Sequence, residues 1–321
     1  MAARKKTSVG VIGLGSMGMG VARTLVARGF DAHGFDVRAE SLRAFARAGG
    51  TAHKTPASLA AACDVVIILV VNADQTSAVL FGKEGAAPAL RKGSVVIASA
   101  TVAPEFAIDL GERLAARGLL MIDAPVSGGA ARAAKGELSI MASGDKAAFR
   151  KADTVLKAIS AKVYRLGDTP VMGYKVKMIN QLLAGVHIAS ACEAIALGIR
   201  AGADPNVLYE VISNSAGSSW MFQNRVPHIL KGDYTPLSAV SIFVKDLGIV
   251  LDSAKKMTFP LPLTAAAHQL YLAAAGAGLS GEDDSAVIKV YQQQSGIALP
   301  AGKAGARKTA ARRRKAPVRK R

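Results

Sequence analysis

The sequence predicts an α/β protein in two parts, an N-terminal doubly wound parallel sheet and a C-terminal all-helical domain, joined by a long interdomain helix. Three observations support this prediction. β-Branched runs alternate with helical stretches from residue 7 to about 165, strand signals vanish from about 171 to 294, and one helical pattern runs from about 171 to 201. Strands that alternate with helices pair in parallel, with helices on both faces of the sheet.

Six apolar segments are the expected strands of the first part. In chain order they read SVGVIG, DAHGFD, DVVIILV, SVVIAS, LLMIDAP and LSIMAS. In the second part, Asp204 and Pro205 are expected to open one helix, and Pro260 and Pro262 to separate two others. We therefore expect a first domain over residues 1–168, a helical domain over 169–300 that begins with the interdomain helix, and a separate tail over 301–321.

The composition predicts a cytoplasmic protein that contacts no membrane. Of the 321 residues, 50% are hydrophobic, yet no stretch reaches the roughly 18 uninterrupted apolar residues of a membrane span. The N-terminus passes from basic residues directly into a strand and a glycine loop, so no signal peptide is expected. Cys63 and Cys192 lie in apolar contexts without metal or redox spacing, and we expect buried free thiols.

Much of the net charge of +18 lies in the C-terminal tail. Residues 301–321 hold ten basic residues, no acidic residue and one large apolar side chain, Val318. Such a segment cannot bury enough surface to offset its ordering entropy, so we expect it to be disordered. It would allow non-specific, salt-sensitive contact with nucleic acid, and a solvated tail without a partner is an equally good interpretation.

The first predicted strand runs directly into the loop GLGSMG, which is followed by a helix. Gly13, Gly15 and Gly18 form a G-x-G-x-x-G, whose glycines allow a tight turn, room for a pyrophosphate and close helix packing. Asp36 ends the second strand, 18 residues past Gly18, where a carboxylate binds an adenosine ribose and repels the 2′-phosphate of NADP. The pattern predicts a Rossmann-type domain that binds NAD, although Arg38 nearby softens the discrimination.

The remainder of the predicted cofactor site lies at strand ends, because ligands of open parallel sheets bind beyond the carboxyl ends of the strands. Asn72 follows the third strong strand and Thr101 the fourth, so both are expected near the ribose or the nicotinamide. A helix cap or a plain loop residue is an equally good interpretation of each. The predicted cofactor-binding residues on these loops are Gly13, Leu14, Gly15, Ser16, Met17, Gly18, Asp36, Asn72 and Thr101.

Three polar residues, Lys177, Asn180 and Gln181, interrupt the apolar surface of the long helix. Offsets of three and four residues place them on one helical face, one turn apart. We interpret this face as the floor of an interdomain cleft with Lys177 as the acid/base; a lysine that reaches solvent from an amphipathic helix is the structural alternative. The five histidines show no paired ligand spacing, so no metal site is expected.

An alcohol dehydrogenation needs a base that is unprotonated when hydride leaves carbon. Lysine at its ordinary pKa of ~10.4 is poorly suited to this near neutral pH. Burial and the positive nicotinamide ring of NAD would both lower the pKa of Lys177, and the protonated amine would be the acid in the reverse direction. Asn180 or Gln181 would orient the amine or a substrate hydroxyl.

Four ordered motifs resemble the β-hydroxyacid dehydrogenases, a family that includes 3-hydroxyisobutyrate dehydrogenase and tartronate semialdehyde reductase. They are GLGSMG at 13–18, DAPVSGG at 123–129, GYKVKMINQ at 173–181 and FVKDLG at 243–248. The resemblance implies that Lys177 exchanges the hydroxyl proton and that Lys245 and Asp246 close the site from the helical domain. It also implies that the SGG element holds the substrate carboxylate through Ser127, Gly128 and Gly129.

Within this family, runs such as QLLAGVHIA and EDDSAVIKVY are similar to the L-threonate dehydrogenases. The resemblance implies NAD-dependent oxidation of a four-carbon sugar acid, L-threonate, to 2-oxo-tetronate. We expect Lys177 to be catalytic, Lys245 to contact the cofactor, and Asn180, Gln181 and Asp246 to contact the substrate together with the SGG element. Gln181 stands where most members have Asn, and Asn180 where the subgroup is expected to have His, which leaves the substrate preference open.

Alternatives remain open at the level of the sequence. Within the enzyme class they are 3-hydroxyisobutyrate dehydrogenase and tartronate semialdehyde reductase. In another class, a nucleic-acid-binding protein on a dehydrogenase scaffold is supported only by the basic tail. The apolar helical half predicts a homodimer or a homotetramer.

Overall fold

The structure, a computed structural model, describes residues 7–300. The predicted disordered tail at 301–321 lies outside the described residues. The chain divides into two compact units, one that ends at Ile179 and one that begins at Asn180. This boundary lies inside the long helix α8 (Met172–Arg200).

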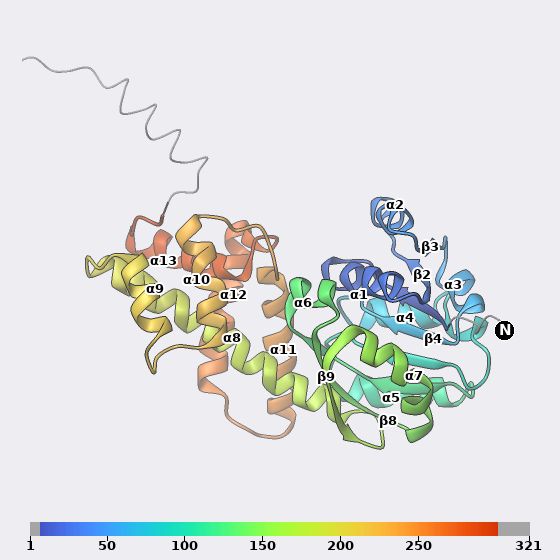
Figure 1. Ribbon diagram of the computed structural model, residues 1–321. Helices are drawn as coiled ribbons and strands as arrows, with labels where there is room; N and C mark the ends of the chain where they lie inside the picture. The colour runs from blue at the N-terminus through green and yellow to red at the C-terminus, as the bar shows by residue number, and fades with distance from the viewer. Residues whose placement is uncertain (1–6, 301–321) are drawn as a thin grey trace, which may run out of the picture. The chain divides into compact units, whose positions relative to one another are not determined.

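The first unit is built around a nine-stranded sheet (Figure 1). Its strands are β1 (Ser8–Ile12), β2 (Asp31–Phe35), β3 (Thr51–Ala52), β4 (Val65–Ile68), β5 (Val95–Ala98), β6 (Leu120–Asp123), β7 (Val126–Ser127), β8 (Leu138–Gly144) and β9 (Ser160–Gly167). They are ordered β3-β2-β1-β4-β5-β6-β8-β7, and β9 pairs with β8. Every neighbouring pair from β3 to β6 is parallel, which confirms the predicted doubly wound order of the central strands.

The sheet is mainly parallel, as predicted, but it is mixed at one edge, which the prediction did not include. β8 pairs antiparallel with β6 and β7, and parallel with β9. A parallel return needs a crossover of about a dozen residues or more. Only α6 (Gly129–Lys135) and two short turns separate β7 from β8, so the chain returns antiparallel.

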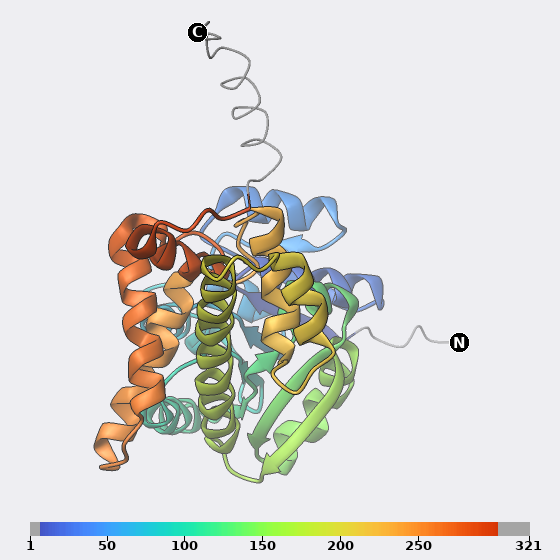
Figure 2. The ribbon, with the colours of Figure 1, turned by 90° about the vertical axis from the view of Figure 1, so that its left-hand side faces the viewer.

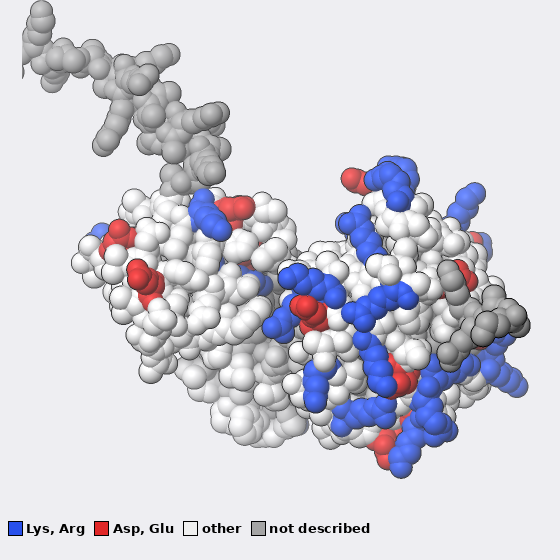
Figure 3. Space-filling view, viewed as in Figure 1, with Lys and Arg blue, Asp and Glu red and all other residues white. Residues whose placement is uncertain are grey.

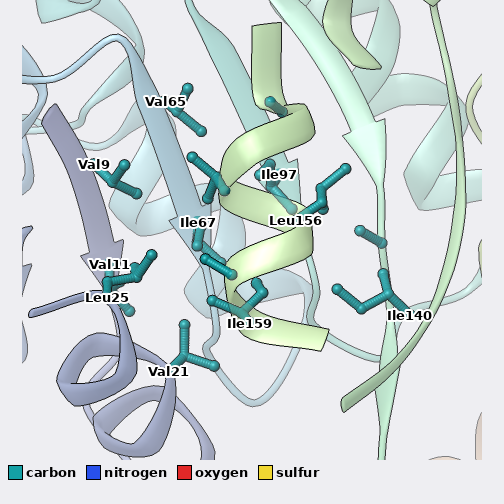
Figure 4. Close-up of a cluster of buried hydrophobic side chains, with 14 of the residues drawn as sticks. Val9, Val11, Val21, Leu25, Val65, Ile67, Ile97, Ile140, Leu156 and Ile159 are labelled. Carbon is teal, nitrogen blue, oxygen red and sulfur yellow. The ribbon is translucent and has the colours of Figure 1, made fainter. Parts of the chain in front are cut away.

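Helices cover both faces of the sheet. They are α1 (Ser16–Ala27), α2 (Ala39–Arg47), α3 (Pro56–Ala62), α4 (Ala73–Phe81), α5 (Pro104–Ala115), α6 and α7 (Lys146–Ile159), with the 3-10 turn η1 (Ala87–Ala89). Val65 and Ile67 of β4 pack in the cluster shared with α1 and α7 (Figure 4), whereas Val66 and Ile68 pack in the cluster on the opposite face. Burial on both faces explains why the central strands read as unbroken apolar runs.

The second unit is helical within the described residues. After α8 it contains α9 (Pro205–Ser213), α10 (Trp220–Lys231), α11 (Val240–Lys256), α12 (Pro262–Ala274), the π-helix η2 (Ala275–Leu279), the 3-10 turn η3 (Asp284–Val287) and α13 (Ile288–Ser295). Asp204 caps α9, as predicted. Pro260 lies between α11 and α12 and Pro262 is the first residue of α12, so the predicted separation of two helices at these prolines is confirmed. Its core also encloses an ion pair, in which Arg225 donates to Asp284 over 2.5 Å.

Helix α8 is one long, unbroken helix (Figure 2), and it begins and ends within a residue of its predicted span. By length and composition alone it would suffice to cross a membrane, with a mean hydropathy of 1.8 over its most apolar window. Its later turns place Ile188, Cys192 and Ile195 in the apolar core of the second unit. Packing inside that unit therefore explains the apolar character of this part of the helix. Cys63 and Cys192 are buried free thiols, as predicted.

Candidate active site

The three glycines of the loop between β1 and α1 differ in whether the surrounding structure requires a glycine. Gly13 has a φ of 94°, and a Cβ there would lie 2.5 Å from the carbonyl oxygen of Leu69. A Cβ on Gly18 would lie 1.8 Å from the carbonyl oxygen of Gly13, so only glycine allows α1 to approach the loop. Gly15 has a φ of −67°, and its Cβ would meet no atom within 4 Å. Packing does not require glycine at position 15, and the space beside it is open to a ligand.

The N-terminus of α1 faces the same loop without a side-chain cap, and Gly15 is its N-cap residue. Uncapped N–H groups at a helix N-terminus, together with the helix dipole, bind phosphate groups. Leu14, Ser16 and Met17 lie on this loop and in the first turn of the helix. The geometry of residues 13–18 therefore fits the pyrophosphate of a dinucleotide.

Asp36 lies directly after β2 and beside the glycine-rich loop. Its Oδ2 accepts the N–H of Leu14 at 2.7 Å, and its Oδ1 accepts the N–H and the Nε–H of Arg38 at 2.9 and 3.1 Å. Burial on its own raises the pKa of Asp36, but the hydrogen bonds from Arg38 and Leu14 outweigh it and lower the pKa from its ordinary value. The position beside the loop fits ribose recognition by an ionised carboxylate.

The other two predicted cofactor residues also follow the carboxyl ends of central strands. The Oδ1 of Asn72, after β4, accepts the N–H of Gln75 at 2.8 Å and caps α4, which is one of the interpretations that the sequence left open. Thr101 is half-buried in the segment after β5. Since β1, β4 and β5 are parallel neighbours, both residues lie at the same sheet edge as the glycine-rich loop. Their contact with a cofactor stays a prediction.

The predicted carboxylate site lies between β7 and α6. β7 ends at Ser127, and Gly128 and Gly129 follow with φ angles of 128° and 73°, which residues with a Cβ rarely adopt. A Cβ on Gly129 would meet no atom within 4 Å, so its surroundings are open. This backbone suits an approach of N–H groups to an anion, although the contact with substrate stays a prediction.

Lys177 lies in the second turn of α8. Its Nζ donates a hydrogen bond to the carbonyl oxygen of Val126 at 2.9 Å. Val126 immediately precedes Ser127, so the structure brings the predicted acid/base to the predicted carboxylate-binding segment. These two motifs are 51 residues apart in sequence at this contact.

A buried contact at the start of α8 was not predicted from the sequence. Asp123, at the end of β6, is fully buried and accepts the N–H of Tyr174 at 3.1 Å together with the N–H and hydroxyl of Ser143. Burial raises the pKa of Asp123 to about 6, against the hydrogen bonds, which lower it. The sequence does carry one signal for this contact. Asp123 is a carboxylate at the end of an apolar strand, where such a group must find buried partners.

In the second unit, four of the predicted residues form one chain of hydrogen bonds. Asn180 Nδ2 donates to Gln181 Oε1 at 3.0 Å, and Gln181 Nε2 donates to Asp246 Oδ2 at 2.5 Å. The other oxygen of Asp246, on α11, accepts Lys245 Nζ at 2.5 Å. The structure thus unites residues predicted from two separate motifs. Their contacts with substrate and cofactor stay predictions.

Two models of known protein families match most of the chain. Residues 8–167 match the NAD binding domain of 6-phosphogluconate dehydrogenase. Residues 172–291 match the model described as NAD-binding of NADP-dependent 3-hydroxyisobutyrate dehydrogenase. The first match confirms the predicted NAD-binding domain.

Relatives match over nearly their full length. The L-threonate dehydrogenase of Cupriavidus necator is 64% identical over 297 residues, which cover 92% of this chain and 99% of that protein. The L-threonate dehydrogenase of Escherichia coli (strain K12) is 49% identical over 296 residues, or 92% of this chain and 97% of that protein.

Solved structures agree with the fold. The crystal structure of 3-hydroxyisobutyrate dehydrogenase from Salmonella typhimurium is 48% identical, with a TM-score of 0.85, and the match covers 89% of this chain and 100% of that chain. The 3-hydroxyisobutyrate dehydrogenase of Mycobacterium tuberculosis, solved with L-serine, is 26% identical with a TM-score of 0.76, covering 89% and 99%. By these matches the chain belongs to the β-hydroxyacid dehydrogenase family, as a 3-hydroxyisobutyrate dehydrogenase-like member.

Proposed function

We propose that this protein oxidises L-threonate to 2-oxo-tetronate with NAD. The 64% identity to the L-threonate dehydrogenase of Cupriavidus necator over 99% of that protein favours this substrate. The structural observation that carries the chemistry is the 2.9 Å hydrogen bond from Lys177 Nζ to Val126 O, because it holds an amine beside Ser127 and the two glycines.

Separate residues of the chain bind the cofactor, transfer the proton and bind the substrate carboxylate. Residues 13–18 and Asp36 hold the cofactor, and bound NAD would supply the hydride acceptor. A neutral Lys177 that donates one N–H to Val126 keeps its lone pair, and with it accepts the proton of the substrate hydroxyl. The backbone N–H groups of Gly128 and Gly129 bind the substrate carboxylate, since no Cβ obstructs its approach.

Gln181 and Asp246 act on the substrate through their neighbours. Both amide atoms of Gln181 already have partners, because Oε1 accepts from Asn180 and Nε2 donates to Asp246. Asn180 still has its carbonyl oxygen and a second N–H, which suit a polyhydroxylated substrate. We therefore assign Asn180 to the substrate hydroxyl groups, and Gln181 to holding Asn180 in place.

A panel of hydroxy acids tests this function. NADH formation is measured with L-threonate, D-threonate and the erythronate isomers, and with 3-hydroxyisobutyrate. We expect the highest kcat/KM with L-threonate. A higher kcat/KM with another acid would refute the substrate assignment and retain the dehydrogenase.

The second candidate substrate is 3-hydroxyisobutyrate. It is favoured by the Salmonella typhimurium structure, which is 48% identical and described as a 3-hydroxyisobutyrate dehydrogenase. Tartronate semialdehyde, assayed in the direction of reduction with NADH, completes the comparison. The three substrates differ in hydroxyl count and chain branching, so one set of kcat/KM values ranks them.

A nucleic-acid-binding role is the alternative from another class. Lys and Arg side chains gather on the visible face of the first unit (Figure 3), and ten further basic residues belong to the tail. A chain that ends at residue 300 is compared with the full chain for turnover and for retention on DNA at low salt. Unchanged turnover with lost retention would make nucleic-acid contact a property of the tail alone.

We also propose that the enzyme acts in the cytoplasm as a homodimer or homotetramer. Two buried free thiols, Cys63 and Cys192, are consistent with a reducing compartment. The second unit exposes large apolar side chains, with exposed fractions of 68% for Leu197, 57% for Val211 and 54% for Trp220. Light scattering of the purified protein would give the oligomeric state, and a monomer would refute this part of the proposal.

A further inference from the structure

The first turn of α8 is attached to the sheet by a buried pair of side chains, Asp123 and Ser143. Asp123 Oδ2 accepts the N–H of Tyr174 at 3.1 Å, and Ser143 Oγ accepts the N–H of Gly173 at 3.2 Å. Asp123 also accepts the N–H of Val171. These are N–H groups that a helix N-terminus leaves without intrahelical partners, and the positive end of the helix dipole favours an anionic acceptor there.

Asp123 and Ser143 are also hydrogen-bonded to each other. Asp123 Oδ1 accepts the N–H of Ser143 at 3.0 Å and the hydroxyl of the same residue. Because that hydroxyl donates to Asp123, its oxygen is oriented to accept from Gly173. Both side chains are fully buried, so water does not compete for these bonds.

Two backbone features show how closely this turn is held. A Cβ on Gly173 would lie 2.4 Å from the carbonyl oxygen of Met141 and 2.7 Å from Asp123 Oδ2, so only glycine fits there. Val171, just before the helix, has a φ of 118°, which a β-branched residue rarely adopts. Such a conformation persists where surrounding contacts over-determine the backbone, and it is found preferentially at functional sites.

The segment that holds the start of α8 also receives the amine of Lys177. Asp123 at the end of β6 and Val126 at the start of β7 are three residues apart, and Tyr174 and Lys177 are three residues apart on α8. Asp123 binds the N–H of Tyr174, while the carbonyl oxygen of Val126 binds the Nζ of Lys177 at 2.9 Å. Two contacts between the same two segments therefore set the helix start and its lysine together.

We propose that Asp123 and Ser143 are positioning residues for Lys177, which hold the first turn of α8 so that the amine stays on the Val126 carbonyl beside Ser127. Neither residue touches the reacting atoms. The inference rests on the proposed function, in which Lys177 is the acid/base.

The test uses Ser143→Ala and Asp123→Asn in the full chain. Steady-state kinetics with L-threonate give kcat, KM for NAD and the pH profile of kcat, and a fluorescence titration gives the affinity for NADH. We expect kcat to fall about tenfold or more, since misplacement of a reacting group by about 1 Å can cost about 100-fold. KM for NAD and the affinity for NADH should stay within about twofold, and the apparent pKa of the kcat profile should shift.

Ser160→Ala is the matched control. Its hydroxyl donates to the carbonyl oxygen of Leu156 at 2.7 Å at the end of α7, so the change removes one serine hydrogen bond in the same unit but not at α8. It should leave kcat and the pH profile as in the wild type. Thermal unfolding of all variants shows whether each is folded, and Ser143→Ala alone decides the question if Asp123→Asn does not fold.

Loss of thermal stability in Ser143→Ala with wild-type kcat and pH profile would overturn the proposal, since the pair would then be structural only. Lys177→Ala separates this failure from a failure of the proposed function. Turnover retained in Lys177→Ala would refute the acid/base role itself. Turnover that is lost in Lys177→Ala but stays at the wild-type level in Ser143→Ala and Asp123→Asn would refute only the positioning role.

Discussion

Lys177 Nζ donates to the carbonyl oxygen of Val126 across 51 residues of sequence, over 2.9 Å. The contact joins the helix motif to the glycine motif that follows β6. An acid/base group must lie within hydrogen-bond reach of the proton that it transfers, so its site of action is set by what holds its nitrogen. In the proposed function, this contact with Val126 would set the reactive carbon of the substrate beside Ser127.

Replacement of Lys177 should abolish turnover and leave cofactor binding intact. General acid/base groups contribute about 10²- to 10⁴-fold to rate, so kcat of Lys177→Ala should fall by at least about 100-fold. Lys177→Arg should fall similarly, because a guanidinium is not deprotonated near neutral pH. Turnover is followed by NADH formation, and NADH affinity by fluorescence titration. Near-normal kcat in either variant would contradict the assignment.

Gly15 and Gly18 should respond differently to alanine. A Cβ at position 15 meets no atom within 4 Å, so Gly15→Ala should keep its free energy of unfolding within about 0.5 kcal/mol and lose NADH affinity. A Cβ at position 18 would lie 1.8 Å from the carbonyl oxygen of Gly13, so Gly18→Ala should be destabilised by about 1–3 kcal/mol. Urea unfolding and NADH titration of both variants check this. Unchanged NADH affinity in Gly15→Ala would exclude a cofactor beside that residue.

The central strands are predictable because their burial is uniform. β4 and β5 are buried on both faces, so each reads as an unbroken apolar run. β9 is missed because exposed Lys162 and Arg165 give it the composition of a surface segment. The antiparallel direction of β8 is missed for another reason, since direction depends on the length of the preceding connection and not on the composition of the strand.

The site is predictable where residue type and spacing carry the chemistry. The glycines of the loop, Asp36 and Lys177 belong to such patterns. The Asp123–Ser143 pair escapes them because its partners are backbone N–H groups and a serine 20 residues away, and neither leaves a mark in the local sequence. The arrangement of Gln181 with Asp246, 65 residues apart, likewise appears only when the helices are packed.

Asp36 and Arg38 should shift the choice between NAD and NADP in opposite directions. Asp36→Asn removes the charge that repels a 2′-phosphate and keeps an acceptor for the N–H of Leu14. A hydrogen bond to a charged group contributes about 1.5–3 kcal/mol, so NAD affinity should fall about tenfold or more while the NADP to NAD ratio of kcat/KM rises. Arg38→Ala unmasks the charge of Asp36 and should lower that ratio. Equal ratios in the wild type and both variants would place the ribose elsewhere.

The stability of the protein should depend on pH through Asp123 in a defined direction. Burial raises the pKa of this carboxyl from 3.8 to about 6, so between these values the folded state binds more protons than the unfolded state. The contribution of this carboxyl to the free energy of unfolding is therefore fully present below about pH 4 and is lost as the pH rises to about 6. A shift of about two units corresponds to about 3 kcal/mol.

Asp123→Asn isolates this contribution, because the other titrating groups are the same in both proteins. Urea unfolding of the wild type and the variant is measured from pH 4 to pH 7 by circular dichroism. The wild type minus variant difference in free energy of unfolding should decrease by up to about 3 kcal/mol as the pH rises, and then stay level. A difference that increases with pH would mean that the hydrogen bonds from Tyr174 and Ser143 stabilise the carboxylate by more than its burial costs.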